Sequence, residues 1–305
     1  MRLATRGSEL ALWQARYVAD RLRAARPGTQ IDLVIVDTSG DRRQDRPVWE
    51  LGGQGVFVKE VQAAVLDGRA DAAVHSAKDL PSRTDPGLIL AAVPVRADPR
   101  DVLVGSTLEQ LGPGAPVATG SVRRRAQLAW LRPDLTFTSL RGNIATRLSK
   151  LPAGGAIVMA AAALQRLGLQ PEVAETLQPS VMLPQVAQGA IAVECRSTDE
   201  EVRSALSQID DPVAAACVRA ERSYLARLGG GCELPVGAYA VPISPEPGSD
   251  LRLEAILASL DGRVILRAEA TGSLASGETL GAGLAEELLD RGGRALLADA
   301  GTTVP

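Results

Sequence analysis

The chain has 305 residues, of which 46% are hydrophobic and 23% charged, and its formal net charge is −3. This length and composition are typical of globular proteins with two or three domains. The mildly acidic balance argues against a nucleic-acid-binding protein, which would need a broad basic face. The sequence has no run of about 18 apolar residues that could span a membrane, and no apolar segment typical of a signal peptide at its start. We therefore expect a cytoplasmic protein without a membrane partner.

Short apolar strand patterns alternate with helical patterns over the first two-thirds of the chain. The predicted strands cover 31–36, 72–74, 88–93, 116–118, 156–159 and 190–193, and the predicted helices cover 9–25, 58–66, 122–131 and 144–151. This alternation favours parallel or mixed sheets with helices on both faces. Residues 39–55 show little periodicity, which predicts a mobile loop. No internal repeat is evident.

Two segments have the composition of connections between lobes. Residues 94–100 are charged and Pro-rich, and residues 179–189 contain two prolines and lead into the predicted strand 190–193. If this strand returns to the first lobe, the two lobes are joined twice and can hinge around a cleft. Ligands in open α/β sheets bind at the carboxyl ends of strands, which would face such a cleft.

A third unit of α+β type is predicted after residue 211. It opens with a helix over 213–228, and two strands follow over 251–260 and 264–270. The strands are joined by Asp261-Gly262, which is a strong hairpin signal. An amphipathic helix over 276–289, with Ser276 at its N-cap, closes the unit.

Three turns combine a predicted helix start with nearby arginines. They are Arg6-Gly7-Ser8, Thr119-Gly120-Ser121 and Ser139-Leu140-Arg141-Gly142-Asn143, and the last residue of each is placed to cap a helix. The second helix begins with three arginines, although basic side chains in a first turn oppose the helix dipole. One such turn is also consistent with a solvated basic surface. Three together favour a ligand with several carboxylates or phosphates, while the lack of Walker and GxGxxG sequences disfavours nucleotides.

Residues 74–81, Val-His-Ser-Ala-Lys-Asp-Leu-Pro, begin at the end of a predicted strand. Lys78 and Asp79 would therefore lie at the mouth of a cleft, although a surface ion pair is the commoner role of a Lys-Asp dipeptide. His75 is the only histidine of the chain. Its place in the strand pattern favours a buried core residue over a general base.

The three cysteines are odd in number and widely spaced, which predicts neither a disulfide framework nor a metal site. Cys195 falls in a strand pattern and Cys217 in an apolar helix pattern, so we expect both to be buried and inert. Cys232 follows three glycines in a predicted loop. It is therefore the candidate for a covalent or nucleophilic role.

These segments together resemble the porphobilinogen deaminase (hydroxymethylbilane synthase) family over nearly the full length of the chain. The motifs that carry the resemblance are 4–15 (ATRGSELALWQA), 57–60 (FVKE), 74–81 (VHSAKDLP), 139–143 (SLRGN), 146–148 (TRL), 164–168 (LQRLG), 188–190 (QGA) and 230–232 (GGC). Each motif is short, but all eight occur in the order found in the family.

The resemblance implies an α/β fold with two lobes like those of periplasmic binding proteins, each with a mixed sheet, around a cleft. A smaller C-terminal α+β domain would follow. The expected domains are 1–95 plus 190–208 with the catalytic aspartate, 96–189 with carboxylate-binding arginines, and 211–305 with the cofactor-anchoring cysteine. The implied protein is a monomeric transferase of porphyrin and haem biosynthesis. It would condense four porphobilinogen molecules stepwise into hydroxymethylbilane, with release of ammonia.

The resemblance also implies roles for individual residues. Cys232 is similar to the cysteine that holds a dipyrromethane cofactor through a thioether bond, and Asp79 to the catalytic carboxylate facing the pyrrole nitrogens. The residues similar to cofactor-binding positions are Ser76, Lys78, Asp79, Thr119, Ser121, Arg123, Arg124, Arg141 and Gln188. The residues similar to substrate-binding positions are Arg6, Ser8, Gln14, Arg141, Asn143, Arg147 and Arg166.

This chemistry would explain the residue types at the site. Each pyrrole ring brings two carboxylates, so a chain that grows to six rings needs many arginines. Loss of ammonia leaves a cationic, azafulvene-like electrophile, which an ionised Asp79 would stabilise. We accordingly expect the replacement of Arg124 or Arg141 to impair cofactor assembly or early chain elongation rather than folding.

Two departures from the family's usual pattern occur. Ala118-Thr119-Gly120-Ser121 stands where relatives usually have Gly-Thr-Ser-Ser, so Gly120 removes one hydroxyl group from this turn. Glu50 and Gln54 stand where relatives often carry lysines. This loop therefore lacks, at these two positions, the lysines that could steer substrate.

Two other classes of protein share part of this pattern. A non-catalytic, anion-binding receptor or effector domain would have the same two-lobed cleft, but it would explain neither Cys232 nor the third domain. A nucleic-acid-binding protein could use the three consecutive arginines, but it would also need an extended basic surface, which this sequence lacks. An adduct of two pyrrole units in the intact-protein mass would separate the deaminase from both.

Overall fold

The structure is a computed structural model that describes residues 1–38, 55, 58–230, 233–244, 246 and 248–301. The chain divides into two compact units, Met1–Ala97 with Gly189–Ala215, and Asp98–Gln188 with Ala216–Pro305. The loop predicted over 39–55 lies outside the described residues except for Gly55. None of the helices in the described ranges is long and apolar enough to cross a membrane.

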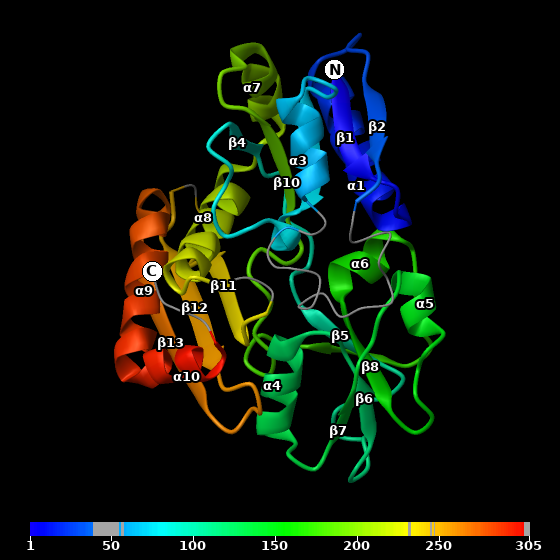
Figure 1. Ribbon diagram of the computed structural model, residues 1–305, viewed down its shortest axis with the longest axis vertical. Coiled ribbons are helices and arrows are strands. Elements are labelled where there is room, and N and C mark those ends of the chain that lie inside the picture. Colours follow the sequence, from blue (N-terminus) through cyan, green and yellow to red (C-terminus); the bar gives the residue numbers. More distant parts are fainter. Residues whose placement is uncertain (39–54, 56–57, 231–232, 245, 247, 302–305) are drawn as a thin grey trace. The chain divides into compact units, whose positions relative to one another are not determined.

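The first unit is built on a five-stranded sheet with the strand order β2-β1-β3-β10-β4 (Figure 1). Its strands are β1 (Arg2–Arg6), β2 (Asp32–Val36), β3 (Ala72–Ser76), β4 (Leu88–Ala92) and β10 (Ile191–Arg196). The strands β2, β1 and β3 run parallel, whereas β10 is antiparallel to both β3 and β4. The predicted return of the chain to the first sheet after residue 189 is therefore confirmed.

Helices cover both faces of this sheet, as the strand–helix alternation predicts. They are α1 (Glu9–Ala25), α3 (Lys59–Leu66) and α7 (Glu200–Leu206), with the short 3-10 helices η2 (Ala77–Asp79) and η3 (Ser207–Ile209). Leu3 packs with residues of α1 and α7, whereas its neighbour Ala4 packs with α3 on the opposite face. Ser8 caps α1 as predicted, since its Oγ accepts a hydrogen bond from the N–H of Ala11 (3.3 Å).

The second unit contains a sheet of the same plan, with the strand order β7-β6-β8-β5-β9. Its strands are β5 (Asp101–Val104), β6 (Pro116–Ala118), β7 (Thr136–Thr138), β8 (Ala156–Ala160) and β9 (Ala174–Leu177). The strands β7, β6 and β8 run parallel, and β5 is antiparallel to β8 and β9. The two sheets thus share one strand arrangement, although the sequence shows no internal repeat.

Three helices accompany the second sheet. They are α4 (Val122–Leu131), α5 (Ile144–Leu148) and α6 (Ala161–Arg166). The predicted caps are confirmed, because Ser121 accepts from the N–H of Arg124 and Asn143 accepts from the N–H of Thr146. The helix α5 ends three residues before its predicted end. Pro152 accounts for the last of these, because a proline disfavours the helical conformation of the residue before it, here Leu151.

The C-terminal part of the second unit is an antiparallel sheet in the order β11-β12-β13. Its elements are most of α8 (Pro212–Arg227), β11 (Val236–Pro242), β12 (Leu251–Ala258), β13 (Ile265–Gly272), the 3-10 helix η4 (Leu274–Ser276), α9 (Gly277–Leu288), the π-helical turn η5 (Leu289–Gly293) and α10 (Arg294–Asp299). Figure 1 shows α9 lying along β12 and β13. The predicted hairpin is confirmed, with a φ of +74° at Gly262. Ser276 precedes α9 as predicted, but its side chain bonds Ser273 rather than the helix.

This C-terminal sheet packs against the second lobe within the same unit. The N–H of Ala238 in β11 donates to the carbonyl of Pro184 (3.1 Å), and the guanidinium of Arg267 in β13 donates to the carbonyls of Pro179 and Ser180 (3.0 Å each). A Cβ at Gly237 would lie 2.8 Å from the carbonyl oxygen of Pro184, so the close approach requires glycine. The Pro-containing segment before Gly189 is therefore held between the two sheets of this unit.

Candidate active site

Lys78 and Asp79 lie directly after β3, in the 3-10 helix η2. The N–H of Ala77 donates to the carbonyl of Ala190 (3.0 Å), next to the start of β10, which ties η2 to the sheet. Both Lys78 and Asp79 are partly exposed. The carboxylate of Asp79 therefore lies at the carboxyl end of a central strand, where ligands of open α/β sheets bind.

A small pocket of about 50 Å³ lies beside Asp79 in the first unit. Its polar lining residues are Arg6, Ser8, Gln14, His75, Ser76 and Asp79. Within this lining, Nε2 of Gln14 donates to Oγ of Ser76 (2.8 Å). The structure thus brings Asp79 together with Arg6, Ser8, Gln14 and Ser76, the four other lining residues that the sequence assigned to binding. They lie in β1, at the N-cap of α1, in α1 and in β3.

A buried polar cluster lies next to the pocket. The side chain of Glu194 in β10 is 1% exposed, and its Oε2 accepts from Nε2 of Gln62 (2.8 Å) and lies 3.2 Å from Nε2 of His75. The interpretation of His75 as a buried core residue is confirmed, although this side chain also lines the pocket. Sequence reasoning missed Glu194; its one signal was an acidic residue within an apolar strand pattern.

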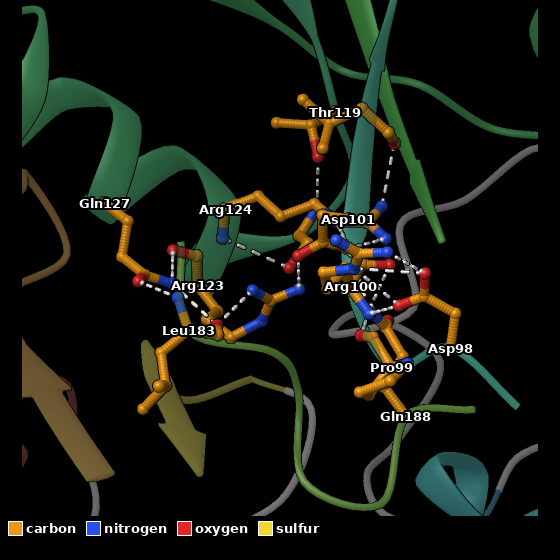
Figure 2. A network of polar contacts seen from close by, with 12 residues as sticks. Asp98, Pro99, Arg100, Asp101, Thr119, Arg123, Arg124, Gln127, Leu183 and Gln188 are labelled. Carbon is orange, nitrogen blue, oxygen red and sulfur yellow. Dashed lines mark hydrogen bonds and ion pairs between the residues drawn. The ribbon is translucent and has the colours of Figure 1, made fainter. Parts of the chain in front are cut away.

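In the second unit, two of the three consecutive arginines are buried in the first turn of α4. Arg123 and Arg124 are 2% and 7% exposed, and Asp101, the first residue of β5, is 0% exposed. Nε and Nη2 of Arg124 donate to Oδ1 of Asp101 (3.0 and 2.7 Å), and Nη2 of Arg123 lies 2.8 Å from Oδ2 (Figure 2). The chain itself therefore supplies one negative charge at the turn where the sequence predicted an anion.

Further hydrogen bonds fix this cluster. Nε2 of Gln188 donates to Oδ1 of Asp101 (2.9 Å), and Nη1 of Arg123 donates to the carbonyl of Leu183 (2.6 Å). Burial alone would raise the pKa of Asp101, but the charges of Arg123 and Arg124 and the hydrogen bonds from Gln188 and Arg124 bring it far below its usual range. Burial lowers the pKa of Arg123, and Asp101 opposes that shift. Sequence reasoning missed Asp101, because nothing in the sequence connects β5 with α4.

The remaining predicted residues of the second unit lie around its helix termini. Oγ1 of Thr119 accepts from the N–H of Ser121 (3.2 Å), so this hydroxyl stabilises the turn before α4. Nε of Arg147 in α5 donates to the carbonyl of Gly142 (2.8 Å). Arg166, at the end of α6, is 9% exposed. Arg141 and Arg147 are partly exposed, and Asn143 is exposed at the cap of α5.

The cysteines divide as the sequence predicts where the structure describes them. Cys195 and Cys217 are buried. Burial raises the pKa of the Cys195 thiol to about 11, which disfavours the reactive thiolate. Cys232, the candidate nucleophile, lies outside the described residues. In the part of the chain that is described, no three His, Cys, Asp or Glu residues are grouped to hold a metal ion.

Comparison with known proteins identifies the family. Residues 1–204 match the family model described as porphobilinogen deaminase, dipyromethane cofactor binding domain, and residues 215–290 match the model described as porphobilinogen deaminase, C-terminal domain. The chain belongs to the porphobilinogen deaminase family. It is 50% identical over 301 residues to porphobilinogen deaminases of Roseiflexus castenholzii and Roseiflexus sp. strain RS-1, which covers 97% of this chain and 98% of each relative.

Among solved structures, a nutrient binding protein from Burkholderia cenocepacia bound to methionine is 14% identical to this chain, with a TM-score of 0.40. The match covers 68% of this chain and 89% of that protein. The fold class predicted from the resemblance, two lobes with mixed sheets and a smaller C-terminal domain, agrees with the three sheets of the structure. Porphobilinogen deaminase models match both the lobes and the C-terminal part, so a receptor or effector domain is not favoured.

The departure from the deaminase pattern at Gly120 has a structural counterpart. A Cβ at this position would lie 2.8 Å from the carbonyl oxygen of Leu140, which is closer than side chains approach backbone atoms. The turn before α4 therefore lies nearer to the segment before α5 than a serine would allow. The second departure, at Glu50 and Gln54, falls outside the described residues.

Proposed function

We propose that this chain condenses four porphobilinogen molecules into hydroxymethylbilane, with release of ammonia, in tetrapyrrole biosynthesis. Membership in the family over nearly the whole chain supports this proposal. The observation that carries it is the position of Asp79 at the carboxyl end of β3, beside a pocket lined by Arg6, Ser8 and Gln14. A carboxylate beside cationic and hydroxyl groups suits a pyrrole that is itself a carboxylic acid and becomes cationic during the reaction.

Asp79 acts on the substrate ring in this proposal. As the bond from the aminomethyl carbon to nitrogen breaks, ammonia leaves with the bonding pair, after the amine has been protonated. Electrons of the pyrrole nitrogen then form the exocyclic double bond, and the ring becomes positively charged. The ionised carboxylate of Asp79 accepts a hydrogen bond from the ring N–H and stabilises that charge.

The arginines and polar side chains of the site bind the acetate and propionate groups. We assign substrate binding to Arg6, Ser8, Gln14, Arg141, Asn143, Arg147 and Arg166. Charge-assisted hydrogen bonds from guanidinium groups to carboxylates are about twice as strong as neutral ones. The mixture of arginines with hydroxyl and amide groups thus gives both affinity and orientation.

The dipyrromethane cofactor is proposed to be held by a thioether to Cys232. When bound, this group supplies the free pyrrole carbon to which substrate units are added. The residues of the second unit fit a group that carries carboxylates, because Nε and Nη2 of Arg123 lack aligned hydrogen-bond acceptors among the described residues. The residues assigned to cofactor binding are Ser76, Lys78, Asp79, Thr119, Ser121, Arg123, Arg124, Arg141 and Gln188.

The proposed division of labour has three domains. Residues 1–95 with 190–208 would carry the catalytic aspartate, 96–189 the carboxylate-binding arginines, and 211–305 the anchoring cysteine. The family resemblance also supports a cytoplasmic, monomeric enzyme that binds no nucleic acid.

Mass spectrometry of the intact protein tests this function. We expect wild-type protein to carry an adduct of two pyrrole units, and Cys232→Ser to fold but carry none and to lose tetrapyrrole synthesis. Cys195→Ser and Cys217→Ser are the matched controls, and they should keep the adduct, because both thiols are buried. An adduct in Cys232→Ser, or its absence from wild-type protein, would contradict the proposal.

A further inference from the structure

The polar cluster around Asp101 carries an unbalanced positive charge. Arg123, Arg124 and Asp101 are all less than one-tenth exposed, so these charges are almost fully removed from water. Arginine stays protonated in proteins, and the lowered pKa of Asp101 keeps its carboxyl ionised. Of the other side chains labelled in Figure 2, Gln127 and Gln188 are neutral, and Arg100 is matched by Asp98. Two positive charges and one negative charge therefore leave a net charge of +1.

The unused hydrogen-bonding groups of the cluster lie on the side of Arg123. Oδ1 of Asp101 accepts from two nitrogens of Arg124 and from Gln188. Oδ2 faces Arg123 alone, whose Nη2 lies 2.8 Å away without the alignment of a hydrogen bond. Nε of Arg123 has no acceptor among the described residues. Since buried donors are rarely left without acceptors, Arg123 lacks a partner that a further carboxylate would provide.

Two other arginine–aspartate pairs of the same unit are matched one to one. Arg132 donates through Nε and Nη2 to the two oxygens of Asp134 (2.8 and 2.7 Å). Arg100 donates in the same way to Asp98 (2.9 and 2.6 Å). Such a two-point arrangement is common in arginine–carboxylate pairs. At Asp101 one carboxylate serves two guanidinium groups. Glu286 also contacts two, those of Arg227 and Arg294, but its side chain is 36% exposed, whereas Asp101 is fully buried.

We propose that Asp101 is the resident carboxylate of a site for two carboxylates, and that one ligand carboxylate takes the second place on Arg123 and Arg124. Asp101 is thus a positioning residue. It holds both guanidinium groups in place before the ligand arrives, and it limits this arginine pair to one carboxylate of the ligand. That the ligand is dipyrromethane rests on the proposed function. That the cluster has a net charge of +1 does not depend on it.

Ligand binding should change the stability of Asp101→Asn and of wild-type protein by different amounts. In Asp101→Asn, two buried guanidinium groups have no counter-charge until a ligand carboxylate arrives. A carboxylate is attracted more strongly to a doubly charged cluster than to a singly charged one. The ligand should therefore stabilise the variant more than it stabilises wild-type protein.

Thermal unfolding of apoprotein and of protein loaded with porphobilinogen measures this difference. Breaking a buried ion pair should lower the unfolding temperature of apo Asp101→Asn by about 5–10 °C, and loading should remove a large part of that deficit. Asp98→Asn is the matched control, because Asp98 and Arg100 are about one-third exposed. It should give the same small shift with and without ligand. Equal deficits in apo and loaded Asp101→Asn would overturn the proposal.

A second arm uses sodium acetate as a carboxylate probe of the apoprotein. Acetate should raise the unfolding temperature of Asp101→Asn more than that of wild-type protein, relative to sodium chloride at equal ionic strength. An equal response would overturn the proposal. The acetate experiment tests the role of Asp101 even if wild-type protein takes up no pyrrole units. The lack of uptake would contradict the proposed function but not the proposal about Asp101.

If apo Asp101→Asn does not fold, the double variant Asp101→Asn/Arg124→Gln tests the proposal in its place. It restores the net charge of the cluster by removing one buried positive charge. The double variant should therefore fold. It should respond to acetate no more than wild-type protein does, because Arg123 alone remains to bind a carboxylate, and a larger response would overturn the proposal. Failure of the double variant to fold, when Arg124→Gln alone folds, would show that Asp101 acts on packing rather than on the arginines, which would also overturn the proposal.

Discussion

The two five-stranded sheets share one strand arrangement, yet they surround their buried acidic residues differently. Each sheet has an antiparallel fourth strand, which contributes Glu194 from β10 in the first unit and Asp101 from β5 in the second. Glu194 contacts the amide of Gln62 and the imidazole of His75, whereas Asp101 contacts two guanidinium groups. One backbone plan thus supports two different electrostatic environments.

The difference fits the proposed division of binding and catalysis between the lobes. In the described part of the first unit, no arginine or lysine pairs with Glu194, and Asp79 adds a carboxylate at the end of β3. The cluster of the second unit is positive, since its arginines outnumber its carboxylate. A carboxylate-rich ligand that becomes cationic during reaction is served by such a division. In the proposed function, the first lobe would stabilise the developing charge and the second would hold the carboxylates.

The largest effect is expected where the buried charges of the second unit are disrupted. Arg124→Ala leaves Asp101 with a single, poorly aligned arginine, and we expect a loss of about 3–5 kcal/mol in the free energy of unfolding. Urea unfolding measures this loss. The exposed neighbour Arg125 is the control, and Arg125→Ala should change stability little. Equal stability of the two variants would contradict the central role of the cluster.

The burial of Arg124 also changes the expectation formed from the sequence. That expectation placed the effect of Arg124→Ala on the ligand and not on folding. Because Arg124 is 7% exposed and its partner is fully buried, we expect Arg124→Ala to affect stability as well as ligand binding. Arg141, which is partly exposed, remains the better test of ligand binding alone. Its replacement should remove a charge-assisted hydrogen bond to a carboxylate of about 1.5–3 kcal/mol without a comparable loss of stability.

The second prediction addresses the negative charge of the first unit. Asp79→Asn keeps the shape of the side chain but removes the charge, so we expect the turnover rate to fall by about 10²–10³-fold. Asp79→Glu keeps the charge and should retain measurable activity. Stability should change little in both variants, since Asp79 is partly exposed. Near wild-type turnover of Asp79→Asn would show that its charge is not needed.

The third prediction compares the two buried acidic residues directly. Glu194→Gln keeps an oxygen that can accept from Gln62, and it removes no arginine pair. We therefore expect a loss of about 1–3 kcal/mol in the free energy of unfolding, less than for Arg124→Ala. Urea unfolding of both variants under the same conditions makes the comparison. A larger loss for Glu194→Gln would mean that charge is not what distinguishes the two clusters.

Local features of the fold could be predicted from the sequence, because local residues determine them. Ser8, Ser121 and Asn143 cap helices as expected, since a side-chain oxygen at that position satisfies N–H groups of the first turn. The strand β1 was missed because Arg2 and Arg6 at its ends interrupt the apolar pattern. The strand β5 was missed because its four residues follow a charged, Pro-rich connection.

The polar clusters could not be predicted in the same way, because their members are distant in sequence. Asp101 is separated from Arg124 by 23 positions, and Glu194 from Gln62 by 132 positions. Their pairing depends on the strand order of each sheet, which no single-sequence pattern reports. The role of Asp79 and the identity of the cofactor came from family resemblance, since a Lys-Asp dipeptide alone also fits a surface ion pair.

The smallest expected effect concerns Asp98, whose side chain is about one-third exposed, unlike that of Asp101. Burial raises the pKa of Asp98, but hydrogen bonds and charge from Arg100 bring it below its usual range. Ionised Asp98 therefore stabilises the folded protein above the unfolded carboxyl pKa of about 3.9, and this contribution is lost as the pH falls through the folded value. Asp98→Asn should cost about 1 kcal/mol or less at pH 7. Urea unfolding at pH 7 and pH 3 checks this. If ionised Asp98 supplies the stability, the difference in free energy of unfolding between Asp98→Asn and wild-type protein should be smaller at pH 3 than at pH 7. An equal difference at both pH values would contradict the prediction.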